Sequence, residues 1–399
     1  MLINILILLV VGLTFLAILQ PKVYSSTGWR ATITPLASII GSGFLILGPV
    51  LVGSFGKMAV LAMAALCVLS YLYGSAIRFN IARIEVNPKR SHYELSLDYL
   101  ASWALAFAYI VSVAYYLNLL GAFAISLLPF ASALLAKLLT TLVFLLILIV
   151  GWTRGFSALE RMEQISVSIK LAIITGLLVG LAWFSATITN HVGILQTPAE
   201  ITGWPAIALL FGLLITVQGF ETSRYLGEEY PAKLRIKSMR WAQWMASLIY
   251  IVYITLISLT FSADEIIMTE TGIIDMMRIV SPALPLLLVA AALSAQFSAA
   301  IADTGGAGGL FAEASNNRIN VRTAYVLLGV IGISLTWLAD IFTIIRYASQ
   351  AFAVYYTLQA LIAALGAYQQ KASVIKVVIY CCLAVIGVLI VFFAQSIEG

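Results

Sequence analysis

Long apolar segments follow one another along almost the whole chain, and they constrain the fold more than any other feature of the sequence. Of the 399 residues, 62% are hydrophobic and 10% are charged, whereas about a quarter of the residues of a soluble protein are charged. Most segments hold about 20 residues, the length of a helix that crosses a bilayer. In lipid a segment must satisfy its own backbone hydrogen bonds, as a helix does. The sequence therefore predicts an all-α polytopic membrane protein.

About twelve transmembrane helices are expected, joined mostly by short loops. They are predicted at residues 2–19, 32–52, 58–81, 95–128, 132–152, 163–186, 204–226, 237–261, 284–312, 321–338, 341–367 and 374–393. The first has neither a basic residue before it nor a small-residue cleavage site after it, so we interpret it as an accessory helix rather than a signal peptide. Cys67, Cys381 and Cys382 lie in apolar segments, and we expect neither a disulfide nor a metal cluster.

Basic residues concentrate in one of the two sets of loops. The opposite set holds only Lys57, Lys137 and Arg278. Because cytoplasmic loops carry the excess of lysine and arginine, we expect the basic set to face the cytoplasm and both chain termini to face away from it. This bias accounts for the net charge of +5 without a nucleic-acid partner. The expected location is a bacterial inner (plasma) membrane. The basic set comprises Lys22, Arg30, Arg78, Arg83, Lys89, Arg90, Arg154, Arg161, Arg224, Lys233, Arg235, Lys237, Arg240, Arg318, Arg322, Lys371 and Lys376.

Gly41, Ser42 and Gly43 interrupt one of the apolar segments near its middle. A glycine costs about 1 kcal/mol relative to alanine inside a helix. In lipid, backbone groups freed by a break must find partners in protein or in a water-filled cavity. Half-helix ends at mid-membrane can hold a charged ligand, but glycines can also let a neighbouring helix approach closely. This segment alone leaves both readings open.

A second interruption favours the ligand site. Thr216, Gln218, Gly219 and Glu221 interrupt an apolar segment that begins near Ala206. Broken hydrophobic segments at corresponding places in the two halves of a chain are the best sequence indication of a transporter site.

With these motifs the chain resembles the amino acid–polyamine–organocation (APC) superfamily. The first core helix of that family carries a motif of the type IIGSG, and the sixth carries GFE followed by an acidic pair and a proline. The matching residues here are Ile39–Phe44, Gly219–Glu221 and Glu228–Pro231. The resemblance extends, in order and spacing, over about residues 34–367.

The resemblance implies a LeuT-like core of five plus five helices. Each set opens with an interrupted helix, and because five is odd, the second set is inverted in the membrane relative to the first. The expected parts are an accessory helix and cytoplasmic link (1–31), core repeat 1 with helices 1–5 (32–186), core repeat 2 with helices 6–10 (187–367) and an accessory C-terminal helix (368–399).

Few charges lie inside the predicted membrane segments, and each is a candidate functional residue. Lys170 lies about two turns inside the fifth core helix, and Asp303 lies in the cytoplasmic half of the eighth. Because an isolated buried charge is costly, we expect the two to pair. The alternatives are a lysine that reaches the interface and an aspartate that pairs with Arg318 or water. Similar transporters often carry a lysine where sodium-driven relatives hold sodium, which implies that sodium is not needed at that position.

Two further charges are candidates for gating. In similar transporters the acid at the position of Glu221 is linked to gating or proton coupling; the alternative is an anchor for neighbouring backbone. Arg346 lies about one and a half turns into the tenth core helix from its outer end. It could form an outer gate or contact a substrate carboxylate, or it could reach the interface or pair with Asp340.

Tyr115 and Asn118, near the middle of the third core helix, are candidates for the pocket lining, although most aromatic residues in such a chain pack or anchor at the interface. The sequence contains no HExxH, no GxSxG, no nucleotide-binding loop and no metal-ligand cluster. We therefore expect neither an enzyme nor a cofactor.

Together these features predict a secondary active transporter of a small amino acid or related amine that works by alternating access. Proton-coupled symport is favoured over exchange, without sodium. The N–H groups of Ser42 and Gly43 would hold the substrate carboxylate, and carbonyls near residues 38–40 and 216–218 would hold its ammonium. The predicted substrate-binding residues are Ser38, Ile39, Gly41, Ser42, Gly43, Tyr115, Asn118, Thr216, Gln218 and Gly219, and the predicted coupling or gating residues are Lys170, Glu221, Asp303 and Arg346.

Two other classes of function stay open on the sequence. One is an ion carrier or channel on the same fold, and the other is a membrane sensor or assembly subunit that does not transport. The expected partners are a small-molecule substrate, a proton and the lipid bilayer. The sequence does not predict an oligomeric state.

Overall fold

The computed structural model describes residues 2–41, 43–86, 91–154, 157–187, 198–226, 230–316 and 318–396. Within these ranges the secondary structure consists of α-helices and short 3₁₀ turns, without strands. This confirms the predicted all-α class. In chain order the helices are α1 (Leu2–Leu19), α2 (Pro21–Tyr24), α3 (Thr27–Ile39), α4 (Gly43–Phe55), α5 (Ala59–Val86), α6 (His92–Ile125), α7 (Ala133–Arg154), α8 (Ser157–Thr187), α9 (Gly203–Gly212), α10 (Thr222–Tyr225), α11 (Ala232–Thr260), α12 (Gly272–Val280), α13 (Leu284–Ala314), α14 (Val321–Leu338), α15 (Ile341–Gln369) and α16 (Val374–Phe393).

Nine helices of the described part of the chain are long and apolar enough to cross a membrane. The difference from the twelve expected spans has two sources. One apolar stretch, Gly43–Glu85, joins α4 to α5 through the 3₁₀ turn Gly56–Met58 (η1). In addition, the apolar helical segments Ala133–Ile149 and Gly203–Gly212 are shorter than a full span. The chain is therefore a polytopic membrane protein, as predicted.

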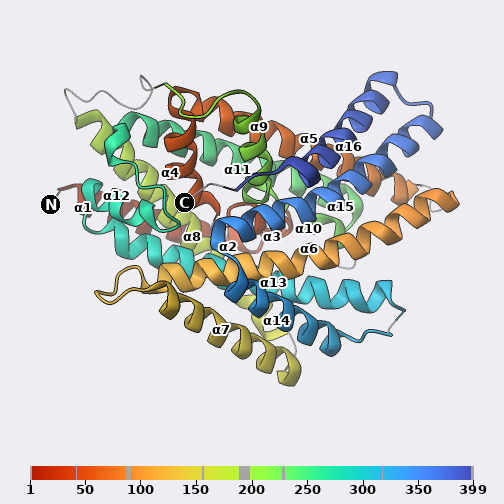
Figure 1. Ribbon diagram of the computed structural model, residues 1–399, viewed down its shortest axis with the longest axis horizontal. Coiled ribbons are helices and arrows are strands. Elements are labelled where there is room, and N and C mark those ends of the chain that lie inside the picture. Colours follow the sequence, from red (N-terminus) through yellow and green to blue (C-terminus); the bar gives the residue numbers. More distant parts are fainter. Residues whose placement is uncertain are drawn as a thin grey trace.

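The helices pack in two groups that meet along α8 and α15. The longest helix, α6, has 34 residues and packs against α7, α13 and α14. On the other side, α11 packs against α3, α4 and α5. Helix α15 contacts both α6 and α5, and α8 contacts both α13 and α11. Several long helices, α6 and α15 among them, run along the long axis of the molecule (Figure 1).

The start of α6 shows how the sequence defines a helix end. Ser91 accepts a hydrogen bond from the N–H of Glu94, and the Glu94 carboxylate accepts one from the N–H of Ser91. This capping box satisfies backbone donors that the first turn leaves free. It also holds Glu94 at the end of α6, where the carboxylate is fully buried.

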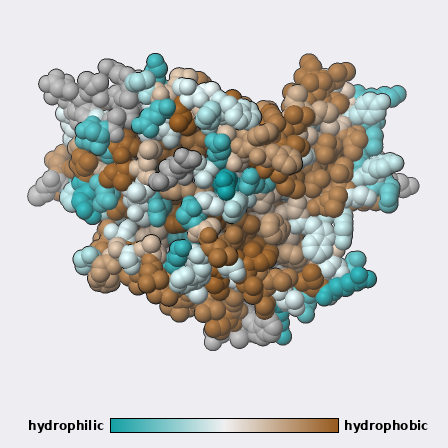
Figure 2. Space-filling model, viewed as in Figure 1, coloured by the Kyte–Doolittle hydropathy of each residue, from teal (hydrophilic) through white to brown (hydrophobic). Residues whose placement is uncertain are grey.

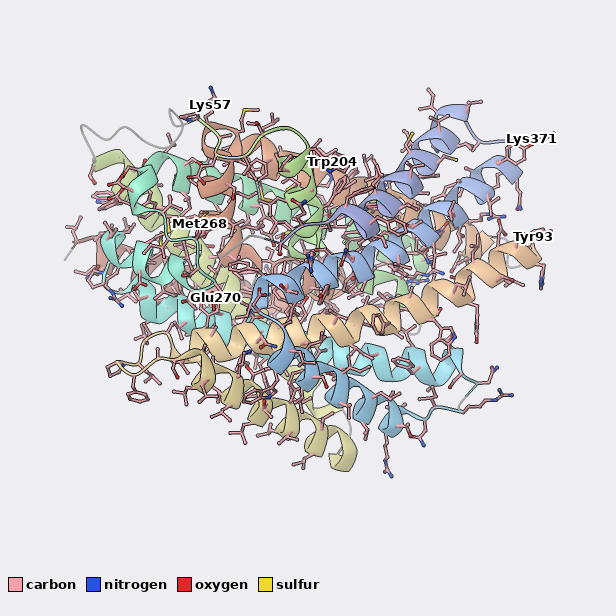
Figure 3. The ribbon with its side chains drawn as sticks, viewed as in Figure 1. Lys57, Tyr93, Trp204, Met268, Glu270 and Lys371 are labelled. Atoms are coloured by element: carbon pink, nitrogen blue, oxygen red, sulfur yellow. The ribbon has the colours of Figure 1, made fainter. Side chains whose placement is uncertain are left out.

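Different residues and loops lie at the two ends of the long axis of the molecule. On the face shown in Figure 2, apolar residues cover much of the area between polar residues at the two ends. Tyr93 and Lys371 lie at one end, and Met268 and Glu270 lie toward the other (Figure 3). Both chain termini lie toward the end that holds α12 (Figure 1). The termini therefore lie toward the same end of the molecule as the loop around Glu270, and the side of the membrane that this end faces stays a prediction.

Candidate functional site at two interrupted helices

The first core helix breaks after Ile39. Helix α3 ends there and α4 begins at Gly43. The N–H of Ile40 still donates to the Leu36 carbonyl at 3.0 Å, but the Ile40 backbone, with φ −83° and ψ 61°, has left the helical region. Ser42 lies outside the described residues. Because Ile39, Ile40 and Phe44 are buried, the break lies inside the protein rather than against lipid.

The sixth core helix breaks over a longer stretch. Helix α9 ends at Gly212, the 3₁₀ turn Leu214–Val217 (η3) follows, and α10 begins at Thr222. Between them, Gly219 has a φ of +114°, a conformation that residues with side chains rarely adopt. Glycine at this position lets the chain turn from η3 into α10.

The two breaks touch each other. A Cβ atom built on Gly219 would lie 2.5 Å from the Ser38 Cβ and 2.8 Å from the Ile39 backbone nitrogen. A Cβ built on Gly43 would lie 2.9 Å from the Thr216 side chain and 2.8 Å from the Tyr115 hydroxyl. The glycines that the sequence marks in the two halves are therefore points of close packing at the breaks, and a role for them in ligand binding stays a prediction.

Buried side chains from other helices satisfy backbone groups of the first break. The ammonium of Lys170 on α8 donates to the Ala37 carbonyl at 2.8 Å. The hydroxyl of Tyr250 on α11 lies 2.8 Å from the Ile39 carbonyl oxygen and 2.7 Å from that of Thr216. Tyr250 therefore joins the first break to the second. This is the protein-based satisfaction that broken helices need in lipid.

Two serines do the same for the second break. The Ser349 hydroxyl on α15 donates to the Gly212 carbonyl at 2.6 Å and accepts from the Ile215 N–H at 2.9 Å. The Ser70 hydroxyl on α5 donates to the Val217 carbonyl at 2.9 Å. These contacts hold η3 in place from two sides.

Glu221 connects the second break to α15. Its carboxylate oxygen Oε2 accepts hydrogen bonds from the Gly219 N–H at 3.0 Å and from the Tyr356 hydroxyl at 2.8 Å. Its other oxygen, Oε1, is buried and has no hydrogen-bond partner among the described residues. The Tyr356 ring stacks between Phe220 and Tyr73. Glu221 thus anchors neighbouring backbone and contacts α15 through Tyr356, and a role for it in gating or proton coupling stays a prediction.

Lys170 lies at the first break, and Asp303 is buried on α13. Lys170 is 3% exposed and so is Asp303, and the Ser112 hydroxyl on α6 donates to the Asp303 carboxylate. Helix α8, which carries Lys170, packs against α13, which carries Asp303. It also packs against α3, the helix that ends at the first break. A cavity of about 10 Å³, bounded by Gly41, Lys170 and Ala292 among others, has room for about one water molecule. Direct pairing of the two charges stays a prediction.

Two other predicted pocket residues, Gln218 and Asn118, differ in what their side-chain amides contact. Gln218 is buried next to the first break, and its amide nitrogen donates to the Tyr116 hydroxyl at 3.4 Å. The amide nitrogen of Asn118 instead bonds to the Ala114 carbonyl and to Thr336 on α14, each at 2.8 Å. Asn118 therefore ties α6 to α14, and a role for it in ligand binding stays a prediction.

Arg346 is half-buried on α15, with its guanidinium 5.1 Å from the centre of the Tyr347 ring. Among the described residues no ion pair joins it to Asp340. Asp340 instead caps α15 by accepting from the Thr343 N–H and hydroxyl. Partial burial raises the pKa of Asp340, but these hydrogen bonds bring it below its ordinary value. A gating role for Arg346 stays a prediction.

Sequence reasoning missed three residues of this region. Tyr250 and Ser70 contact the breaks from two different helices, and each type is common as a packing residue in apolar helices. The third is Gln296 on α13, which is fully buried with both amide atoms lacking partners among the described residues. The available signal was an amide side chain within a mostly apolar membrane segment.

This fold and site define a class of protein: an integral membrane protein that encloses the unwound centres of two interrupted helices. The chain belongs to the APC superfamily of transporters, whose sequence model matches residues 21–394. An uncharacterized protein of Aquifex aeolicus (strain VF5) is 39% identical over 393 residues, which cover 97% of this chain and 95% of that protein. The predicted family is confirmed.

Proposed function

We propose that this protein is a secondary active transporter of a small amino acid or related amine, coupled to protons and independent of sodium. Membership of the APC transporter family supports transport of a small molecule across a membrane. The observation that carries the proposal is the contact of two helix breaks at Gly219 and Ser38 inside the protein. Residues 32–186 and 187–367 would form the two inverted repeats, which rock around this centre to give alternating access.

The two breaks offer groups of opposite polarity to a zwitterion. The N-terminal end of α4, at Ser42 and Gly43, would hold the carboxylate, because free helix N–H groups and the helix dipole favour an anion. Carbonyls near residues 38–40 and 216–218 would hold the ammonium. Since Ile39 and Thr216 already share the Tyr250 hydroxyl, the ammonium would use their remaining lone pairs.

Removal of the Lys170 ammonium is expected to abolish proton-driven uptake. The ammonium donates to the Ala37 carbonyl at the break, and Lys170→Ala removes both this donor and the positive charge. Uptake of labelled amino acids is measured in proteoliposomes, with sodium and proton gradients imposed separately. Wild-type uptake should follow the pH gradient alone, and Lys57→Ala, at an exposed lysine, should behave like the wild type.

Strict sodium dependence of the wild type, with no effect of pH, would refute the role of Lys170. An ion flux without amino-acid uptake would favour the ion carrier. If Lys170 and Asp303 pair, Lys170→Ala alone should lower stability more than Lys170→Ala with Asp303→Asn, because a single replacement leaves the other charge buried.

Gln296 is expected to contribute to ligand binding rather than to stability. It lies one turn from Ala292, which lines the small cavity at Gly41, and two turns from Asp303, so the three share a face of α13. An unsatisfied buried polar group costs about 1–3 kcal/mol. Gln296→Leu should therefore keep or raise the unfolding temperature while it lowers substrate affinity.

The matched control for this prediction is Gln350→Leu. The Gln350 amide donates to the Val391 carbonyl at 2.9 Å, so its replacement should lower stability by about 1 kcal/mol and leave affinity unchanged. Thermal unfolding and binding titrations are measured on the same purified samples. Normal affinity in a stable Gln296→Leu protein would exclude a ligand role for this amide.

The proposed orientation places the loop around Glu270 outside the cytoplasm. A Glu270→Cys variant, in a background with Cys67, Cys381 and Cys382 replaced by serine, should react with an impermeant thiol reagent on intact cells. A cysteine at Lys371, at the other end of the molecule (Figure 3), should react only after lysis. The opposite labelling pattern would show that the protein is inserted the other way round.

A further inference from the structure

A cavity of about 410 Å³ lies away from the helix breaks, between α2, the start of α3 and the start of α11. Its size falls within the range of roughly 300–1,000 Å³ that is usual for ligand pockets. The polar and aromatic residues of its lining are Lys22, Ser26, Trp29, Thr32, Lys237, Ser238 and Trp241. None of these residues is part of the site described above, so the cavity is a separate feature of the molecule.

The cavity carries positive charge. Lys22 comes from α2 and Lys237 from α11, so the two ammonium groups belong to walls that are far apart in sequence. No carboxylate is present among its lining residues, all of which belong to the described part of the chain. A cavity with two cations and no acid favours an anion.

The start of α3 adds hydrogen-bond donors to this charge. Ser26 caps the helix by accepting from the Trp29 N–H at 3.2 Å, and the remaining N–H groups of a first helical turn have no partner within the helix. A Cβ atom built on Gly28, which also lines the cavity, would meet no atom within 4 Å. There is thus open space beside the helix N-terminus, where an anion is stabilised by the helix dipole.

The rest of the lining is apolar and suits a lipid more than a soluble anion. Val23, Leu234 and Met245 contribute aliphatic surface. Trp241 is 56% exposed, and tryptophan is typical of the membrane–water interface. Both lysines belong to the basic loops that are expected to face the cytoplasm, whose leaflet is the anionic one. A headgroup phosphate would lie between the lysines, and the glycerol and first acyl carbons would lie against the apolar wall.

We propose that this cavity binds the headgroup of an anionic phospholipid of the cytoplasmic leaflet. The occupant would bridge α11 to the start of α3, the helix whose other end forms the first break. With 13 residues, α3 is about 20 Å long, so the lipid would contact one end of the helix that carries the Ala37 and Ile39 carbonyls at its other end.

The test measures binding of dioleoylphosphatidylglycerol to the full-length protein in detergent, counted by native mass spectrometry. Each lysine near an anionic headgroup contributes about fivefold in affinity, so Lys22→Gln with Lys237→Gln should weaken binding about 25-fold. The matched control, Lys371→Gln with Lys376→Gln, removes two other basic-loop charges and should leave affinity unchanged. Dioleoylphosphatidylcholine should bind much more weakly than phosphatidylglycerol.

A second variant tests the cavity without changing charge. Gly28→Leu fills the open space beside α3 and should also weaken lipid binding, while thermal unfolding in lipid-free detergent confirms that the variant folds. Equal weakening by both lysine pairs would overturn the proposal in favour of diffuse attraction to basic loops. Displacement of the lipid by inorganic phosphate at similar concentration would overturn it in favour of a soluble-anion site.

Discussion

Replacement of Gly219 with alanine is expected to abolish substrate binding and to lower the unfolding temperature. The φ of +114° is strained for any residue with a side chain, at a cost of about 1–3 kcal/mol. The new methyl group would also lie 2.6 Å from the Ser38 carbonyl carbon and 2.8 Å from the Ile39 nitrogen. Because these are backbone atoms, the clash cannot be relieved by a side-chain rotation and must separate the two breaks.

Alanine substitutions at two other glycines provide comparisons for Gly219→Ala. Gly309→Ala on α13, where an added Cβ would meet no atom within 4 Å, should behave like the wild type in both unfolding and binding. Gly43→Ala should fall between the two, because the added Cβ would meet side-chain atoms of Tyr115 and Thr216 rather than backbone atoms. If Gly219→Ala binds substrate with wild-type affinity, the contact between the breaks is not the site.

Removal of the Arg83 side chain is expected to destabilise the protein by about 3–5 kcal/mol, the usual cost of breaking a buried ion pair by removing one partner. Arg83 is 8% exposed, and its guanidinium contacts the fully buried Glu94 carboxylate. A second guanidinium nitrogen donates to the Gln369 side chain at 2.6 Å. This one arginine therefore joins α5, α6 and α15, and Arg83→Ala would leave the Glu94 charge buried without it.

The exposed pair Arg278–Asp275 provides the comparison. Its side chains are 61% and 56% exposed, and an exposed pair contributes about 0–1 kcal/mol. Arg278→Ala should therefore shift thermal unfolding little. Adding Glu94→Gln to Arg83→Ala should recover part of the loss, because it removes the uncompensated charge. Equal shifts for Arg83→Ala and Arg278→Ala would mean that the buried Arg83–Glu94 pair contributes no more to stability than the exposed pair does.

The sequence predicted the helix breaks because their cause is local. Glycine and polar residues are unfavourable inside an apolar helix, so Gly41, Gly43 and Gly219 mark the breaks without any knowledge of the fold. Lys170 and Glu221 were recognisable for a similar reason, since a charge in a membrane segment has few harmless explanations. The all-α class followed from the length and apolarity of the segments.

The partners of the broken backbone could not be predicted, because contact across the fold depends on helix rotation and register. Tyr250 is one of 18 tyrosines, and nothing local distinguishes the one that faces both breaks. Asn118 is a second example: its amide nitrogen donates to Thr336 on α14, a partner that the sequence does not indicate. The twelve expected spans exceed the nine of the described chain because α4 and α5 form one continuous apolar stretch and because Ala133–Ile149 and Gly203–Gly212 are shorter than a full span.

The Tyr250 hydroxyl has a single proton, and it faces two carbonyl oxygens at nearly equal distance. The hydroxyl can donate a full hydrogen bond to only one of the two carbonyl oxygens at a time. At this contact there is therefore one more acceptor than there are donors. A solute that brings N–H protons corrects this imbalance, whereas a solute that brings only lone pairs adds to it. The first selection between solutes at this contact would therefore depend on how many N–H donors a solute carries, before its size or shape matters.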